Sequence, residues 1–305
     1  MTKPAHTFAL IGAAGFIAAR HMKAIKETGN NLVAALDPFD SVGIIDSFFP
    51  EAHFFTEPER FDRHLDKLRR TITSKVDYVS ICSPNYLHDA HIRMALRNGA
   101  NAICEKPLVL NPWNLDALAD IEKESGKRIF TILQLRHHPA IVALKNKIAQ
   151  SDDAAKRYNI QLEYITSRGN WYFRSWKGNV EKSGGIATNI GVHFFDMLTW
   201  IFGAAKENIL TQYQPDRASG KLVLERADVN WFLSINAETL PNEVKQQNKR
   251  TYRTLTVDGE EIEFSDGFTD LHTESYRHIL AGNGFGLEDA RASVQIVHEI
   301  RKQSL

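Results

Sequence analysis

Three small residues, Gly12, Gly15 and Ala18, follow the apolar run FALI at intervals of three positions. Glycine permits a tight turn after a strand and lets the backbone approach a pyrophosphate at the start of a helix. The spacing departs from the G-x-G-x-x-G pattern, so the loop taken alone is equally compatible with an ordinary turn. We predict a dinucleotide-binding loop whose contacts come from Gly12, Ala14, Gly15, Phe16 and Ile17.

An aspartate ends the next apolar run, NLVAALD. Asp37 stands 25 residues after Gly12, close to where an acidic residue bonds the ribose 2′-hydroxyl of NAD. The residues that follow, Pro38, Phe39 and Asp40, include no arginine that could hold a 2′-phosphate. The sequence therefore favours NAD over NADP. The alternative is that Asp37 only begins a turn, as Asp-Pro pairs often do.

Polar residues follow the apolar runs DYVSIC and NAIC. In open parallel sheets, ligands bind beyond the carboxyl ends of the strands, so both loops should face the cofactor. Lys106 comes directly after a strand and before a proline, on stiff backbone suited to reaching a reacting hydroxyl. The alternative for Lys106 is a solvated surface lysine. The predicted cofactor contacts in these loops are Ser83, Pro84, Asn85, His88, Glu105 and Lys106.

The order of apolar runs and helical patterns predicts two domains. In residues 1–135, the runs FALIG, NLVAALD, DYVSICS, NAICEKP and RIFTILQ alternate with helix signals, which is typical of βαβ units. We predict an α/β Rossmann-type, doubly wound parallel sheet there. Residues 136–305 carry longer alternating strands, YNIQLEYITSRG, LVLERADVNWFLSIN and RTYRTLTVDGEEIEF, with helices at GVHFFDMLTWIFG and LEDARASVQIVHEIRK. This pattern predicts an α+β domain with an open, mostly antiparallel sheet for substrate binding and oligomerisation.

Composition favours a small-molecule partner and the cytoplasm. The 37 basic residues balance the 37 acidic ones, which indicates no general attraction to nucleic acid or membrane. No apolar stretch reaches the ~18 residues of a membrane span. The start of the chain resembles an export signal, but glycines interrupt its apolar run and basic residues close it at once. Cys82 and Cys104 lack metal-ligand spacing, so we expect reduced core thiols and no metal.

Three ordered motifs, SICSPNYLH, CEKPL and SGGIATNIGVHFFD, resemble the glucose-fructose oxidoreductase and inositol dehydrogenase family, Gfo/Idh/MocA, over essentially the whole chain. The segments GAAGFIAARH, QLRHHPAI and SRGNWYFRSWKG are most similar to its UDP-N-acetyl-2-amino-2-deoxyglucuronate (UDP-GlcNAcA) 3-dehydrogenases. The resemblance implies NAD, a homotetramer, and oxidation of the sugar C3 hydroxyl to a ketone in bacterial surface polysaccharide (O-antigen) synthesis. Several such relatives recycle their NADH with 2-oxoglutarate.

The same resemblance suggests His193 and Lys106 as catalytic residues. Removal of hydride from a secondary alcohol requires a base at the hydroxyl, and a histidine with an ordinary pKa near ~6.5 suits this role. Lys106 would polarise and position the hydroxyl. The family usually has an aspartate four residues before the histidine, but this chain has Asn189, which we expect to bond the substrate. The alternative for His193 is a partly buried helix histidine among aromatic neighbours.

The segment SRGNWYFRSWKGNVEKS, residues 167–183, intersperses basic and aromatic side chains. A UDP-uronate brings a pyrophosphate and a carboxylate, which cations bind, and a sugar or base, which rings can cover. The alternative is a strand edge whose aromatic residues face the core. The predicted substrate-binding residues are Lys106, Arg168, Asn170, Tyr172, Trp176, Lys177, Asn189 and His193.

Two other functions remain compatible with the sequence. The first is an NAD-dependent dehydrogenase of a free polyol or sugar, which would act without UDP. The second is a non-catalytic, NAD-binding regulator that kept the fold, since fold does not determine function.

Overall fold

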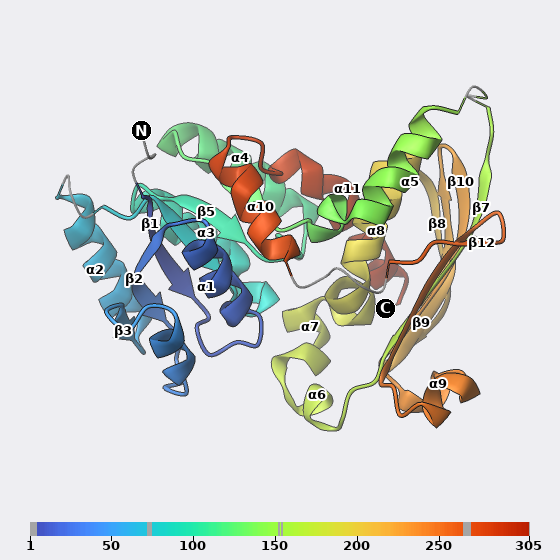
Figure 1. Ribbon diagram of the computed structural model, residues 1–305, viewed down its shortest axis with the longest axis horizontal. Helices are drawn as coiled ribbons and strands as arrows, with labels where there is room; N and C mark the ends of the chain where they lie inside the picture. Colours follow the sequence, from blue (N-terminus) through green and yellow to red (C-terminus); the bar gives the residue numbers. More distant parts are fainter. Residues whose placement is uncertain (1–4, 72–74, 152, 154, 265–269, 305) are drawn as a thin grey trace. The chain divides into compact units, whose positions relative to one another are not determined.

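The computed structural model describes residues 5–71, 75–151, 153, 155–264 and 270–304, and the chain forms two compact units (Figure 1). The first unit contains residues 1–109, 113–134 and 269–289; the second contains residues 110–112, 135–268 and 290–305. A single boundary at residue 135 therefore does not describe the packing, because residues 269–289 join the first unit.

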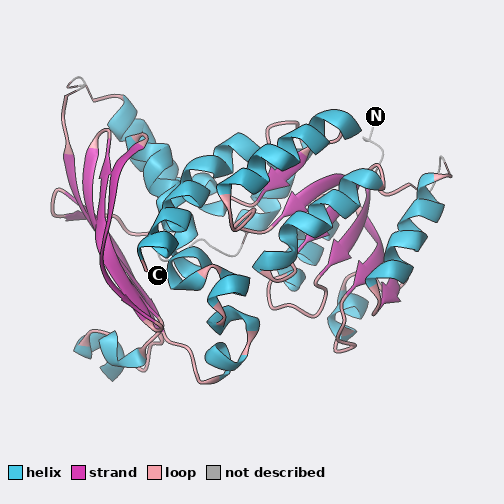
Figure 2. Ribbon diagram, turned by 180° about the vertical axis from the view of Figure 1, so that it is seen from behind, coloured by secondary structure: helices cyan, strands magenta, loops and turns pink. Residues whose placement is uncertain are grey.

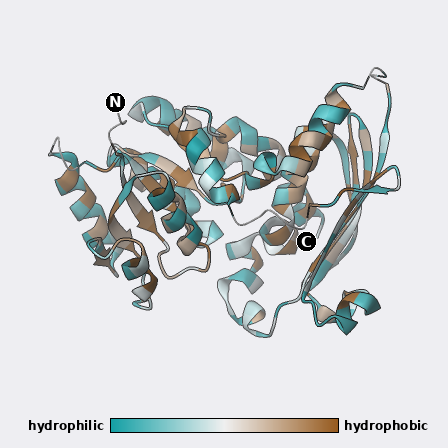
Figure 3. Cartoon of the chain, in the orientation of Figure 1, coloured by the Kyte–Doolittle hydropathy of each residue, from teal (hydrophilic) through white to brown (hydrophobic). Residues whose placement is uncertain are grey.

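A six-stranded parallel sheet forms the centre of the first unit, in the order β3-β2-β1-β4-β5-β6. This order is that of a doubly wound Rossmann sheet, so the predicted fold class is confirmed. Its strands are β1 (Thr7–Ile11), β2 (Asn31–Leu36), β3 (His53–Phe55), β4 (Tyr78–Ile81), β5 (Asn101–Cys104) and β6 (Ile129–Thr131). In Figure 3 these strands are largely brown, the colour of hydrophobic residues, as expected for strands covered on both faces.

Helices pack against this sheet (Figure 2). They are α1 (Ala18–Glu27), α2 (Pro58–Arg69), α3 (His88–Arg97), α4 (Pro112–Ser125) and α10 (Leu271–Leu280). The helix α2 begins at Pro58, and proline is favoured at the first helical position. Likewise α3 ends just before Gly99, whose φ of 75° suits a glycine.

The helix α10 is far in sequence from the rest of the first unit, yet it lies beside α1 (Figure 1). Thr273 donates a 2.8 Å hydrogen bond to the Glu27 carboxylate, and Lys23 bonds Asp270 at 2.8 Å. The sequence patterns did not predict this helix, nor the short strand β3. Its residues supply part of the buried network described below.

The second unit is built on a six-stranded sheet in the order β12-β11-β7-β10-β9-β8. Among the strands that the structure describes in this sheet, only β7 and β10 pair in parallel, so the expected open, mostly antiparallel sheet is confirmed. Its strands are β7 (Tyr158–Thr166), β8 (Ala205–Gln214), β9 (Arg217–Leu224), β10 (Ala227–Ser234), β11 (Thr251–Val257) and β12 (Glu260–Glu261). A hairpin turn at Asp258-Gly259 joins β11 to β12, with φ of 52° and 84° at these residues.

The predicted single strand LVLERADVNWFLSIN is wrong. It divides at Glu225 and Arg226 into the antiparallel pair β9 and β10. The strand β8 was missed altogether, because most of its side chains are exposed and no apolar alternation marks it.

One face of the second sheet is lined by helices, as Figure 1 shows for α5, α8 and α11. The helices of this unit are α5 (Pro139–Ala149), α6 (Trp171–Arg174), α7 (Val180–Ser183), α8 (Val192–Phe202), α9 (Asn242–Gln246) and α11 (Leu287–Gln303). Buried side chains of α8, including Phe195 and Leu198, share a core with alternate residues of β7, β9 and β10. This packing fixes the helix on which His193 lies.

Candidate active site

The glycine loop turns as the sequence predicts. Gly12 has a φ of 91°, and a Cβ atom at this position would lie 2.7 Å from the carbonyl carbon of Cys82. Its amide donates to the Leu36 carbonyl at 2.8 Å, and the Gly15 amide donates to the Gly12 carbonyl at 3.0 Å. The helix α1 starts at Ala18, so its N-terminal amides follow the turn directly. This arrangement suits a pyrophosphate.

Asp37 makes the turn contact that the sequence left open, and it also bonds the glycine loop. One carboxylate oxygen accepts the amide of Ala14 at 2.9 Å, so Asp37 ties the end of β2 to the glycine loop. The other accepts the amide of Phe39 at 3.0 Å, which is the turn contact expected of an Asp-Pro pair. Each oxygen can accept a further bond, so a ribose hydroxyl fits here, whereas the carboxylate would repel a 2′-phosphate. The residues present therefore fit NAD.

Histidine 88 joins the loops after β4 and β5. Its buried ring nitrogens lie 2.8 Å from the carbonyl oxygen of Ser83 and 2.7 Å from that of Pro107. Burial lowers the pKa of His88, although both carbonyls and the carboxylate of Glu105 oppose this effect. The Ser83 hydroxyl bonds His91 at 2.8 Å, so it is already engaged inside the unit. His88 thus acts in the structure as a brace between the two loops.

Glu105 and Lys106 follow β5 directly. The Glu105 carboxylate is buried, with 7% of the residue exposed, while Lys106 is half-buried. The amide of Lys106 donates to Glu105 Oε2 at 3.2 Å. Glu105 also bonds His21 and His272, two residues that the sequence patterns did not predict. No local signal could have found them, because they lie 84 and 167 positions from Glu105.

The other predicted cofactor residues vary in exposure. Phe16 is 90% exposed and Ile17 is half-buried, both in the loop before α1. Pro84 is half-buried and Asn85 is buried after β4. These positions are at the carboxyl ends of their strands, in keeping with the general rule for parallel sheets.

In the second unit, His193 and Asn189 lie on continuous helical backbone. A π-helical turn, Ala187–Gly191, leads into α8, and such turns are frequent at functional sites. Asn189 donates a 2.8 Å hydrogen bond to the hydroxyl of Tyr172. Burial raises the pKa of Tyr172, which keeps the phenol protonated. His193 is half-buried in the first turn of α8.

The basic and aromatic segment contains two environments. Arg168 and Asn170 are exposed, whereas Tyr172 is buried and bonded to Asn189. Lys177 lies over the Trp176 ring, with its Nζ 4.4 Å from the ring centre. Burial, and then the charge of Arg168, lower the pKa of Lys177. Two neighbouring cations of which one is partly desolvated are suited to an anionic ligand.

One glycine and one arginine of this unit have structural functions. Gly184 ends α7 with a φ of 82°, and its carbonyl accepts the hydroxyl of Thr188 at 2.7 Å, which links the end of α7 to the π-helical turn. Arg136 forms a bidentate pair with Asp196 of α8, at 2.7 and 3.1 Å, and both side chains are buried. Arg136 therefore anchors α8.

Figure 1 and these contacts define a class: an enzyme that pairs a Rossmann unit with an α+β unit on an open sheet, as NAD-dependent oxidoreductases do. Residues 6–133 match the family described as "Oxidoreductase family, NAD-binding Rossmann fold", and residues 156–228 match "Oxidoreductase family, C-terminal alpha/beta domain". The chain belongs to the Gfo/Idh/MocA oxidoreductase family.

Solved structures of a dehydrogenase from Thermus thermophilus, WlbA (WbpB), are similar to this chain. One, in complex with NAD and alpha-ketoglutarate, is 53% identical, with a TM-score of 0.93, over 97% of this chain and 94% of that one. Another, in complex with NAD and UDP-GlcNAcA, is 52% identical with the same TM-score and coverage.

Curated relatives are more distant. Inositol 2-dehydrogenase of Rhizobium meliloti (strain 1021) is 26% identical over 199 residues, which are 64% of this chain and 54% of that protein. The chain spans less than half the length of three other curated relatives, 36% to 46%. Within the described residues, no helix is both long and apolar enough to cross a membrane.

Proposed function

We propose that this protein oxidises the C3 hydroxyl of UDP-GlcNAcA to the 3-keto sugar, with NAD as hydride acceptor and 2-oxoglutarate as the oxidant that recycles it. The similarity to the Thermus thermophilus dehydrogenase carries this proposal. That enzyme is 53% identical over 97% of the chain, and its structures contain NAD with alpha-ketoglutarate and NAD with UDP-GlcNAcA. The local geometry supports a dinucleotide in the first unit and an anionic ligand in the second.

The first unit would hold NAD. The amides at the start of α1 would bind the pyrophosphate, and Asp37 would accept a ribose hydroxyl while its bonds to Ala14 and Phe39 hold the loop in shape. NAD, when bound, supplies the acceptor for the hydride that leaves C3. The other proposed contacts are Gly12, Gly15, Phe16, Ile17, Ser83, Pro84, Asn85, His88, Glu105 and Lys106.

His193 would take the proton of the C3 hydroxyl, and Lys106 would donate a hydrogen bond to the same oxygen. As hydride leaves C3, this oxygen becomes a carbonyl, so loss of its proton must accompany the transfer. A cationic Lys106 stabilises the negative charge that develops on the oxygen, which is where electrostatic catalysis is most effective. The reverse steps would reduce 2-oxoglutarate, with His193 returning the proton.

The second unit would bind the sugar nucleotide. Arg168 and Lys177 supply positive charge for a pyrophosphate or carboxylate, and the Trp176 ring beside Lys177 supplies a flat apolar surface. Asn189, oriented by its bond to Tyr172, would contact the sugar. Asn170 completes the proposed set.

A single-turnover absorbance measurement at 340 nm tests the reaction. Purified protein with oxidised NAD receives UDP-GlcNAcA, and then 2-oxoglutarate. We expect a stoichiometric rise that falls when the keto acid is added. Free glucuronate and inositol serve as matched controls without UDP. A flat trace with UDP-GlcNAcA would contradict the proposal. A rise with inositol would favour a polyol dehydrogenase. No rise with any of the three compounds would favour a non-catalytic regulator.

Substitutions test the assigned residues. Lys106→Ala and His193→Asn should each lower the rate of NADH formation by roughly a hundredfold or more, a typical loss for a positioned acid or base. Glu207→Gln, a change on the mostly exposed strand β8, is the control that should leave the rate unchanged. Unchanged rates in both site variants would remove these residues from the mechanism.

We also propose a cytoplasmic homotetramer that acts in surface polysaccharide synthesis. The two cysteines are buried and unpaired, as expected for a reducing compartment. Light scattering after size-exclusion chromatography measures the oligomeric state: a mass near four chains is expected, and a monomer would contradict it.

A further inference from the structure

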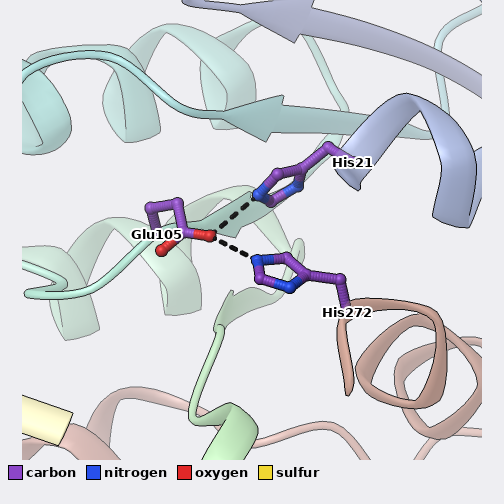
Figure 4. A group of neighbouring side chains, drawn as sticks. All are labelled: His21, Glu105 and His272. Atoms are coloured by element: carbon purple, nitrogen blue, oxygen red, sulfur yellow. Dashed lines mark hydrogen bonds and ion pairs between the residues drawn. The ribbon is translucent and has the colours of Figure 1, made fainter. Parts of the chain in front are cut away.

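Three buried side chains from distant segments meet beside the end of β5 (Figure 4). His21 comes from α1, the helix that starts after the glycine loop, and His272 comes from the first turn of α10. Glu105 lies between them and directly precedes Lys106. The exposed fractions are 0% for His21, 7% for Glu105 and 1% for His272. None of the functions assigned above uses the two histidines.

The hydrogen bonds of this group have a single consistent direction. Nε2 of His21 and Nε2 of His272 lie 3.0 and 2.8 Å from the same carboxylate oxygen, Oε1 of Glu105. Because a carboxylate only accepts, both imidazoles must donate. The Nδ1 atom of His21 then accepts from the Tyr276 hydroxyl at 2.7 Å, which in turn accepts from Ser80 at 2.6 Å. The donor and the acceptor of each hydrogen bond in this series are therefore defined.

The second carboxylate oxygen connects the group to the proposed catalytic lysine. Oε2 of Glu105 accepts the backbone amide of Lys106 at 3.2 Å. Glu105 thus accepts two imidazole bonds on one oxygen and a backbone amide on the other. The two imidazole bonds prevent the carboxylate from rotating, so the orientation of Oε2 depends on them.

The electrostatics agree with these directions. Burial alone would raise the pKa of Glu105, but the hydrogen bonds from His21 and His272 outweigh it and hold this pKa well below its usual range. Burial lowers the pKa of His21, in spite of its bond to Glu105. A neutral His21 that donates to an ionised Glu105 is the state in which the whole chain of bonds is satisfied.

Two imidazoles and a carboxylate could also hold a divalent cation, and the geometry argues against that use. Ligand atoms of a tetrahedral zinc site stand about 3.3 Å apart, given metal bonds of ~2.0–2.1 Å. The separations here, 2.8 and 3.0 Å, are those of N–H···O hydrogen bonds. A metal-bound imidazole also donates its other N–H, yet Nδ1 of His272 has no hydrogen-bond partner among the described residues.

We propose that His21 and His272 are positioning residues that clamp the Glu105 carboxylate and, through its bond to the amide of Lys106, fix the backbone from which the Lys106 side chain extends. The clamp joins the helix after the nucleotide loop to the lysine, so both are held to one rigid group. Its catalytic importance depends on Lys106 and therefore rests on the function proposed above.

Three variants test the clamp. His272→Leu removes one donor to Glu105. His272→Gln keeps an amide N–H close to where Nε2 donates, so it is the conservative rescue. Asn98→Ala is the matched control: Asn98 is buried in the same unit and bonds Asp62 at 2.7 Å, but it follows α3, before β5 begins. Its loss should destabilise the unit without affecting the end of β5.

Hydrogen–deuterium exchange of the peptide that contains Glu105 and Lys106 measures the clamp directly. The exchange rate should rise roughly tenfold in His272→Leu, which is the effect expected when a hydrogen bond to a charged group is lost. It should stay near the native rate in His272→Gln and Asn98→Ala. In the same variants, kcat for UDP-GlcNAcA should fall by about tenfold in His272→Leu alone, with KM changed less than about threefold. Exchange and kcat in His272→Leu equal to those in Asn98→Ala would overturn the clamp.

Glu105→Gln gives a second measurement that does not depend on His272→Leu folding. The glutamine amide can still accept from both imidazoles, but its NH2 group cannot accept from the amide of Lys106. Faster exchange at Lys106 is expected, and native exchange would overturn the clamp. Lys106→Ala separates the two proposals: if it retains native kcat, the proposed function of Lys106 fails, while the exchange rates still decide whether the clamp exists.

Discussion

The side-chain amide of Asn189 donates a 2.8 Å hydrogen bond to the hydroxyl of Tyr172. Asn189 lies in the π-helical turn before α8, and Tyr172 lies in α6 of the basic and aromatic segment. The bond therefore joins the helix that carries His193 to the segment proposed to bind the sugar nucleotide. Tyr172 is a buried anchor for Asn189, with only 2% of the residue exposed.

Removal of this bond tests whether Asn189 must be oriented. Tyr172→Phe keeps the ring and removes only the hydroxyl, so the bond from Asn189 to Tyr172 is lost. We expect kcat for UDP-GlcNAcA to fall by about tenfold, the loss of one well-placed hydrogen bond, with the Kd for NAD unchanged. Tyr252→Phe on β11 is the control, because it removes a half-buried tyrosine hydroxyl outside the candidate site. Equal kcat in both variants would contradict the prediction.

Asn189→Asp restores the residue that the family usually has. Asn189 and His193 are four positions apart on one helical backbone, so a carboxylate there would favour the protonated form of the histidine. The pH at which kcat/KM reaches half its maximum on the acid side should move upward by about one pH unit. A profile that stays in place in the variant would show that position 189 does not act on the base.

The glycine loop gives a prediction about sterics. Gly12→Ala places a Cβ atom 2.7 Å from the carbonyl carbon of Cys82 and also strains a φ of 91°. Gly29→Ala strains a φ of 75° but meets nothing within 4 Å, so it is the control for strain alone. We expect Gly29→Ala to cost about 1 kcal/mol of unfolding free energy and Gly12→Ala to cost more, with weaker NAD binding. Urea denaturation and NAD titration measure the two effects, and equal losses would exclude the steric explanation.

Parallel strands were the easiest part of the fold to predict, for a physical reason. The buried parts of these strands, such as FALI in β1 and AIC in β5, are continuous apolar runs that end at glycine or polar residues. The strand β8, AKENILTQYQ, has mostly exposed side chains, so its pairing depends on β9 rather than on its own pattern. A strand of this kind leaves little signal in the sequence.

The site was predictable only where its residues are close in sequence. The glycine turn, Asp37 and the residues after β4 and β5 follow from local spacing. The partners that hold them do not: His272 and Tyr276 reach Glu105 and His21 across 167 and 255 positions. The two hydrogen bonds that the Asp37 carboxylate accepts from backbone amides could not be predicted either, because they depend on how the loop folds back onto β2.

The buried pair of Arg136 and Asp196 should be much more important for stability than an exposed pair of the same kind. Asp196→Asn removes the negative charge that faces the Arg136 guanidinium in a buried setting, which costs about 3 kcal/mol or more. Arg157 and Asp228 form an equally close, bidentate pair, but at the surface, where water screens the charges, so Asp228→Asn should cost much less than Asp196→Asn. Chemical denaturation compares the two. Similar losses would show that burial does not decide the energy of the Arg136 pair.

Acid should destabilise the first unit through His91. Burial, with a smaller effect from His88, lowers the pKa of His91 from 6.5 to about 4. Above pH 6.5 the ring is neutral in both the folded and the unfolded chain, so it has no effect on the pH dependence there. Between pH 6.5 and 4 the unfolded chain binds a proton that the folded one does not, so the free energy of unfolding falls.

His91→Gln removes this titration and can keep a bond to the Ser83 hydroxyl. From pH 7 to pH 4, native protein should lose up to about 3 kcal/mol more unfolding free energy than the variant, because each pKa unit is worth about 1.4 kcal/mol. The other buried histidines titrate in both proteins and cancel in the difference. Urea denaturation of both proteins across this range gives the measurement. Parallel pH curves would mean that His91 already binds its proton in the folded chain, and that its burial does not keep it neutral.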